Sequence, residues 1–293
     1  MQPSPTDGLL ASDSASRLLT RLDEQAAAAV RPVDADGVHD LRVAVRRFRQ
    51  WLATFGSGLP RGDVKRMVRR LKAIMDCAGA VRDRDVTLKI LAKCHVAGVA
   101  PLRRKLASER RDAARALAAE ARRWKQSRAA AKWRARIAPA AASQPGGDLA
   151  KRARKYLAHG DAAADEKSGA QELHRFRIEG KKLRYTIELL APRLGAAAAD
   201  WLEKLKAIQT VLGDVHDARM ARERAERLGA AAPVEAWLKR RQRKKIRDFR
   251  ALWPQAFPED QHVRLVAALR HTPRKPMARS AADAPAAVAV KRA

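Results

Sequence analysis

The spacing of apolar residues between residues 38 and 55 is the feature that most constrains the fold. These residues recur at intervals of three and four, which places them in one stripe along an α-helix and predicts a buried face. The stripe consists of Val38, Leu41, Val45, Phe48, Leu52 and Phe55. A second stripe, rotated by about 100° around the helix, is cationic and consists of His39, Arg42, Arg46 and Arg49. The sequence therefore predicts a helix whose buried face is bordered by like charges.

The cationic stripe needs compensation, because like charges three or four residues apart destabilise a helix by roughly 0.2–0.5 kcal/mol per pair. Ion pairs with nearby carboxylates on a solvated face are one explanation. The composition argues against it, because the 293 residues include 62 Lys and Arg but only 32 Asp and Glu, a formal charge of +30. This excess favours a polyanionic partner.

The rest of the chain has the same helical character. Alanine, leucine and arginine dominate, period-two alternation is absent, and Gly and Pro mostly fall between periodic segments. We expect an all-α fold. The expected helices span about 9–30, 36–56, 61–79, 83–95, 99–125, 148–159, 168–191, 198–212, 215–228 and 232–253.

The sequence contains an internal repeat. A shift of 135 residues places LHRFRIEGKKLRYTIELL (173–190) on the first stretch, and every member of the cationic stripe then has a basic counterpart. Gly180 replaces Val45, which indicates a close approach to another helix. A shift of 134 residues places LKAIQTVLGDVHDAR (205–219) on LKAIMDCAGAVRDRD (71–85).

The repeat predicts two tandem helical bundles, over residues 8–138 and 147–271, separated by the Pro- and Gly-bearing segment 139–147. A pseudo-twofold axis between them would set the two basic stripes opposite each other across a shared cleft. Residues 272–293 are rich in Pro and Ala with basic ends, and we expect a disordered tail there.

The two cysteines, Cys77 and Cys94, have neither zinc-site nor disulfide spacing, and the start MQPSPTDGLL lacks the order of a signal peptide. We expect a reducing, cytoplasmic setting. No run of about 18 uncharged apolar residues is present, so we expect no membrane span.

The paired segments also resemble a known family. VHDLRVAVRRFRQ and LHRFRIEGKKLRY, each followed by a K-x-x-x-x-x-x-G-x-x-[RH]-D segment, resemble the CHAD family, named for histidines on an α-helical domain. The resemblance spans roughly residues 9–255, with two motifs in each half. It implies two four-helix bundles related by a pseudo-twofold axis around a basic channel. It also implies non-enzymatic binding of inorganic polyphosphate, association with polyphosphate granules, and no cofactor or metal.

Site residues follow from the resemblance position by position. The implied phosphate contacts are His39, Arg42, Arg46, Arg47, Arg49, His174, Arg177, Lys181, Lys182 and Arg184. Further candidates are Lys72, Arg82, Lys206 and His216. Arg175 stands where the first half has Asp40, so the two halves need not bind equally. The chemistry agrees independently, because polyphosphate offers evenly spaced charges without bases, and only 4% of the chain is aromatic.

Nucleic-acid binding is the main alternative, because a strongly basic protein with a sequence pI near 11 has the electrostatic character of a nucleic-acid binder. Polyphosphate is expected to bind more tightly than DNA or RNA. No zinc-finger spacing or aromatic RNA-binding signature is present, and Tyr185 is the one aromatic of the second stretch that could stack on a base.

A metal-dependent hydrolase is the other alternative, because His-Asp doublets occur at His39-Asp40 and at residues 216–217. The repeat keeps neither doublet, and such a site needs a further His and Asp on the same metal. We expect instead that Asp83 and Asp217 cap a helix or orient an arginine of the stripe.

Overall fold

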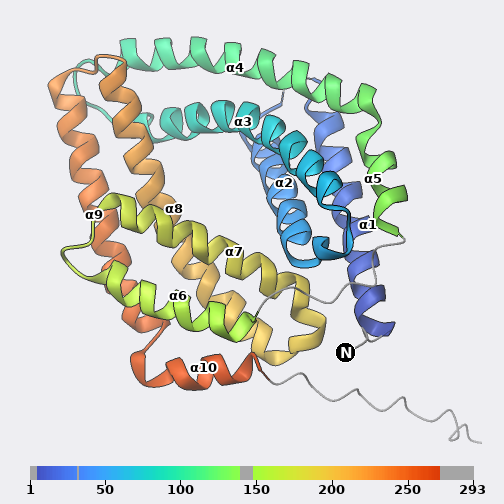
Figure 1. Cartoon of the computed structure of the whole chain (residues 1–293). Coiled ribbons are helices and arrows are strands. Elements are labelled where there is room, and N and C mark those ends of the chain that lie inside the picture. Colours follow the sequence, from blue (N-terminus) through green and yellow to red (C-terminus); the bar gives the residue numbers. More distant parts are fainter. Residues whose placement is uncertain (1–4, 32, 139–147, 271–293) are drawn as a thin grey trace, which may run out of the picture.

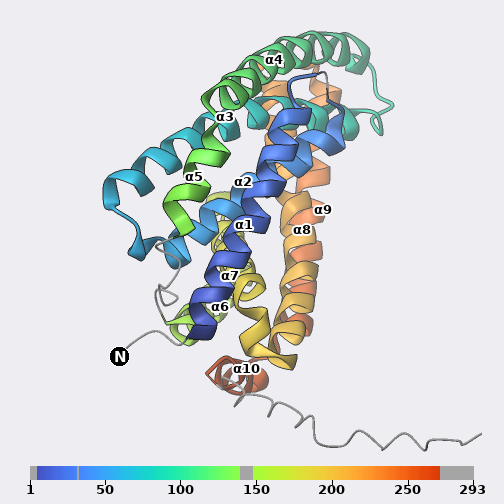
Figure 2. The same ribbon diagram turned by 90° about the vertical axis from the view of Figure 1, so that its right-hand side faces the viewer.

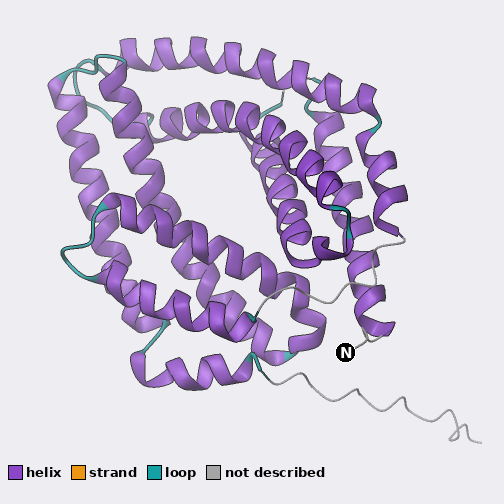
Figure 3. Cartoon of the chain, in the orientation of Figure 1, coloured by secondary structure: helices purple, strands orange, loops and turns teal. Residues whose placement is uncertain are grey.

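The computed structural model describes residues 5–31, 33–138 and 148–270, and these residues form α-helices with short connections and no strand. The all-α expectation is confirmed (Figure 3). The helices are α1 (Pro5–Ala28), α2 (Ala35–Phe55), α3 (Arg61–Leu91), α4 (Val99–Ser127), α5 (Ala129–Ile137), α6 (Leu149–Ala164), α7 (Ala170–Leu194), α8 (Ala196–Arg227), α9 (Ala232–Ala256) and α10 (His262–Ala268). Within these described ranges, no helix is both long and apolar enough to cross a bilayer. The expected tail and interdomain segment lie outside the described residues.

Two predicted helix breaks, near 79–83 and 212–215, are wrong. Helices α3 and α8 run through Gly79 and Gly213 without interruption. An isolated glycine costs a helix only about 1 kcal/mol relative to alanine. The apolar residues on either side of both glycines are buried, and their packing outweighs this cost. The short helices α5 and α10 were not predicted. Helix α5 begins directly after Arg128, whose φ of 51° turns the chain away from α4.

The helices pack in two sets (Figure 1). In the first, α2 packs on α1 and α3, and α4 packs on α3 and α1; in the second, α7 packs on α6 and α8, and α9 packs on α8 and α6. Figure 2 shows α8 and α9 side by side as a long hairpin. The two sets meet where α2 packs on α7 and α3 packs on α8. These four helices carry the repeated motifs. The domain boundaries and the pseudo-twofold axis stay predictions.

The predicted apolar stripe of α2 is buried along its whole length, and so are its counterparts on α7. Both stripes belong to one hydrophobic core that extends through both sets of helices. Trp51, next to the stripe, is fully buried, and its Nε1 donates hydrogen bonds to Ala11 O and Ser14 Oγ, at 3.1 Å each. These bonds satisfy the polar atom of a large core side chain and join α2 to α1.

Two glycines allow helix α6 to approach its neighbours closely. A Cβ on Gly180 of α7 would lie 3.0 Å from Cε2 of Tyr156, which supports the close approach predicted there. A Cβ on Gly160 of α6 would lie only 2.0 Å from Cζ2 of Trp253 on α9. The buried Trp253 ring therefore occupies the space that any larger residue at position 160 would need.

Gly160→Ala should lower the free energy of unfolding by about 1–3 kcal/mol, because the added methyl group forces the Trp253 ring or helix α6 to move. Gly213→Ala is the matched control inside α8, where no atom lies within 4 Å of the added Cβ. It should raise the free energy of unfolding by up to about 1 kcal/mol. Urea unfolding of both variants tests this, and a Gly160→Ala variant as stable as the parent would contradict the packing of α6 on α9.

Candidate functional site

A cavity of about 430 Å³ lies among α2, α3, α7 and α8, and basic side chains form much of its lining. Helix α2 contributes three arginines, helix α7 contributes a histidine, an arginine and two lysines, and helix α8 contributes one histidine. These residues are Arg42, Arg46, Arg49, His174, Arg177, Lys181, Lys182 and His216. The remaining lining residues are uncharged: Gln50, Ala53, Met75, Ile178 and Tyr185. Eight of the fourteen sequence-predicted site residues therefore meet in one place.

The packing of α2 on α7 brings these cations together. Gln50 Nε2 on α2 donates a hydrogen bond to Thr186 Oγ1 on α7, at 3.0 Å, and both side chains are buried. Thr186 Oγ1 donates in turn to Lys182 O at 2.9 Å. Gln50 lies one turn after Arg46 and lines the same cavity, so this hydrogen bond holds α2 against α7 beside the cations.

Four cations of the cavity are poorly solvated: Arg42, Arg46, Arg177 and Lys181. Burial lowers the pKa of Arg42 to about 10, and it also lowers the pKa values of Arg46 and Arg177. Lys181 is affected most: burial, followed by repulsion from Arg177, Arg46 and Arg42, lowers its pKa to about 6. Each shift means that the folded protein disfavours the charged form. A bound anion would relieve that cost.

Asp217 on α8 is a half-buried carboxylate that interacts electrostatically with these cations. Its pKa is raised by burial, although the neighbouring Arg177 opposes the shift, and the carboxylate in turn favours the charged forms of Arg177 and Lys181. Asp83 on α3 acts in the same direction on Arg42. Of the two roles predicted for these aspartates, helix capping is wrong, because both lie inside the continuous helices α3 and α8. Their electrostatic effect on Arg42 and Arg177 agrees with the other predicted role, an interaction with an arginine of the stripe.

Two histidines stack on each other beside the arginines. The ring centroids of His174 and His216 lie 5.0 Å apart, and among the described residues neither buried Nδ1 atom has a hydrogen-bond partner. Burial, with repulsion from Arg177 next, lowers the pKa of His216 to about 3, and burial also lowers the pKa of His174. Both rings are therefore neutral near pH 7.

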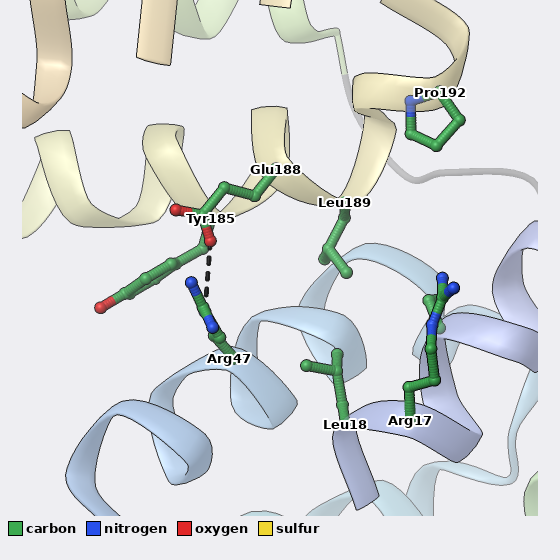
Figure 4. Close-up of a pocket in the computed structure, with 8 residues that line it drawn as sticks. Arg17, Leu18, Arg47, Tyr185, Glu188, Leu189 and Pro192 are labelled. Carbon is green, nitrogen blue, oxygen red and sulfur yellow. Dashed lines mark ion pairs between the residues drawn. The ribbon is translucent and has the colours of Figure 1, made fainter. Parts of the chain in front are cut away.

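The other predicted site residues lie outside this cavity. Arg47 lines a second pocket, of about 290 Å³, which shares Tyr185 with the cavity, and there it pairs with Glu188 at 3.3 Å (Figure 4). Arg184 also pairs with Glu188, at 3.5 Å, and its guanidinium covers the Tyr185 ring. Lys72 pairs with Asp76 at 2.5 Å.

His39, Arg82 and Lys206 are also absent from the cavity lining. His39 is exposed, and burial of part of its ring, followed by repulsion from Arg82, lowers its pKa. Arg82 Nη1 donates to Ala35 O at 3.3 Å. Lys206 is exposed on α8.

Sequence reasoning missed Gly79 of α3 as part of this site. A Cβ on Gly79 would lie 2.7 Å from Arg42 Nη1, so the glycine leaves the space in which the guanidinium lies. Its counterpart Gly213 has no such neighbour. The sequence signal for this role is the glycine shared by both repeats, Gly79 and Gly213, although the expected helix bounds place a helix end there. No group of three or more potential metal-ligating residues occurs in the described part of the chain.

The free energy of unfolding should rise with pH between about 6 and 10, because Lys181 has a folded-state pKa of about 6 and an unfolded-state value near 10.4. The unfolded chain binds more protons throughout that range, so stability is lost as the pH falls. Urea unfolding at pH 7 and pH 9 measures this difference. Lys181→Met should reduce it, whereas Lys182→Met, at an exposed neighbouring position, should leave it unchanged. Equal differences in both variants would contradict the crowded environment of Lys181.

Comparisons with known proteins agree with this architecture. The crystal structure of the CHAD domain from the plant Ricinus communis is similar with a TM-score of 0.65 and 21% identity, covering 90% of this chain and 91% of that chain. PptA from Streptomyces chartreusis is similar with a TM-score of 0.56 and 18% identity, covering 87% and 99%. At these identities the likeness concerns the fold. No curated protein sequence matches closely enough to count as a relative. The model of the CHAD domain family matches residues 14–226, and the chain therefore belongs to the CHAD family.

Proposed function

We propose that this protein binds inorganic polyphosphate in the cavity among α2, α3, α7 and α8, without catalysing a reaction on it. The observation that carries the proposal is the group of basic side chains that line one cavity, partly buried and largely without neutralising carboxylates. Membership of the CHAD family supports the same ligand. Such a site is costly in the free protein and gains most from a ligand with several closely spaced negative charges.

The two sides of the cavity would hold the ligand differently. The α2 side presents arginines, whose planar forks can each hold two oxygens of a phosphate group. The α7 side adds Arg177 and the point charge of Lys182. Lys181, with a pKa of about 6, would take up a proton as the anion binds. A phosphate between Arg46 and Arg177 would touch both helix sets. Binding would therefore strengthen the contact between α2 and α7 and neutralise the positive charge along it.

Exposed cations at and around the cavity would guide polyphosphate toward the less exposed ones. Arg49 and Lys182 are exposed at the cavity, and His39 and Arg82 lie close enough to the cavity cations to affect one another electrostatically. A polyphosphate longer than the cavity would pass over such groups. Many exposed basic side chains of this kind would also let the protein attach to polyphosphate granules in the cytoplasm.

Nucleic acid fits this site less well. Single-stranded nucleic acid gains about 1–3 kcal/mol per base from stacking on aromatic rings. Tyr185 lines the cavity, but it is only 4% exposed and its ring lies under the guanidinium of Arg184, 4.9 Å from the ring centroid. A base therefore has no open aromatic face to stack on there.

Competition at one fixed salt concentration tests the proposal, because affinity for any polyanion depends steeply on ionic strength. Long-chain polyphosphate should displace a labelled polyphosphate at least tenfold more effectively than double-stranded DNA or RNA of equal phosphate concentration. Arg46→Gln should lower the affinity about tenfold, an amount equivalent to about 1.4 kcal/mol. Arg115→Gln removes the same charge from an exposed position on α4 and should have little effect. Equal displacement by nucleic acid, or equal losses in the two variants, would contradict the proposal.

Gly79→Ala should weaken polyphosphate binding about three- to tenfold while leaving thermal stability nearly unchanged. The added methyl group meets only the end of the flexible Arg42 side chain, which moves away and loses its position in the cavity. Gly213→Ala makes the same change at the matching position of the repeat, meets nothing, and should leave affinity at the parental value. Calorimetric titration of both variants measures the difference. Equal affinities would show that Gly79 does not position Arg42.

A further inference from the structure

Lys181 is the most crowded cation of the cavity. It belongs to the lining, and charged or titratable groups face it from three helices. These groups are His39, Arg42 and Arg46 on α2, His174 and Arg177 on α7, and His216 and Asp217 on α8. Helix α3 contributes the uncharged Met75 to the same cavity. Among the described residues, Lys181 forms no ion pair.

This environment changes the chemistry of the amine. With a pKa of about 6, most Lys181 side chains are unprotonated at pH 7.5, whereas an ordinary lysine with a pKa near 10.4 has only about 0.1% free amine at that pH. A desolvated lysine beside other cations is a recognised form of activated nucleophile. The Lys181 amine also borders an open cavity, so a small molecule can reach it.

We propose that Lys181 is an acylation site for acyl phosphates, small anions in which a phosphate group carries an activated acyl group. The inference rests on the proposed function, because the arginines that would hold polyphosphate would also hold the phosphate of the acyl donor. Arg46 and Arg177 lie beside Lys181 and suit that role. The cavity thus places arginines that can bind a phosphate group next to an unprotonated amine.

The reaction needs no further reactant. The lone pair of Nζ attacks the carbonyl carbon, a C–N bond forms, and the C–O bond to phosphate breaks with its electron pair on the departing oxygen. Inorganic phosphate leaves among the arginines, and the proton lost by the amine passes to the solvent. The product is an uncharged amide. Because an amide is not protonated when a polyanion binds, acylation should weaken polyphosphate binding several-fold.

Acetylation of the full chain with two reagents tests the inference. Acetic anhydride is uncharged and measures the reactivity of the amine, whereas acetyl phosphate also measures anion capture. Peptide mapping by mass spectrometry compares Lys181 with Lys182, its exposed neighbour, between pH 5.5 and pH 9. With the anhydride, the Lys181 rate should level off above about pH 7. With acetyl phosphate at pH 7.5, Lys181 should react at least tenfold faster than Lys182, and saturating polyphosphate should abolish this advantage.

The Arg177→Gln variant provides a second measurement, the midpoint of the Lys181 pH–rate profile, which would not change if Arg177 had only a structural role. Arg177 is the charge that most disfavours protonation of Lys181, so its removal should shift the midpoint of the Lys181 pH–rate profile to higher pH. Lys181 rates that keep rising with pH as those of Lys182 do, or equal acetylation of both lysines by acetyl phosphate, would overturn the inference. Calorimetry on the same samples separates the two proposals. Tight polyphosphate binding with an unreactive Lys181 overturns only the acylation site, whereas selective acetylation without polyphosphate binding overturns only the proposed function.

Discussion

The contact between α2 and α7 is the constraint on which the site depends. Two helices that each carry a stripe of cations would repel each other if they met alone. They meet here because the apolar stripe beside each cationic stripe is buried in one continuous core, and the buried hydrogen bond from Gln50 to Thr186 lies at the contact. The core therefore holds in place a charge arrangement that electrostatics alone would disperse.

The lowered pKa values of the cavity cations reflect this conflict between burial in the core and repulsion among like charges. Arginines remain charged at pH 7 even when burial disfavours it, whereas Lys181 gives up its proton more readily and reduces the local repulsion. Asp217 offsets part of the remaining charge from α8. The free protein thus balances hydrophobic burial against repulsion. An anion that enters the cavity shifts this balance, because it is attracted to the same cations that destabilise the free state.

The sequence predicted the helices that build the site and eight of the residues that line the cavity, but not which of the other predicted cations lie outside it. The apolar spacing of residues 38–55 and its repeat identified α2, α7 and their buried faces, because local periodicity reports which face packs. It could not separate Arg46, which lines the cavity, from Arg47, which pairs with Glu188 in a second pocket. That distinction depends on how two distant helices cross. The role of Gly79 was missed for the same reason, because it involves Arg42 on another helix.

The central claim is that the fold holds mutually repelling cations together in the cavity, where they bind an anion. Thermal unfolding of the Arg46→Gln variant with and without polyphosphate tests this claim most directly. At one salt concentration, the ligand-free variant should be as stable as the parent or more stable by up to about 1 kcal/mol, because one source of repulsion is gone. Polyphosphate should raise the melting temperature of the parent, and the increase should shrink in the variant. A variant that melts lower without ligand, yet gains as much from polyphosphate as the parent, would contradict the account.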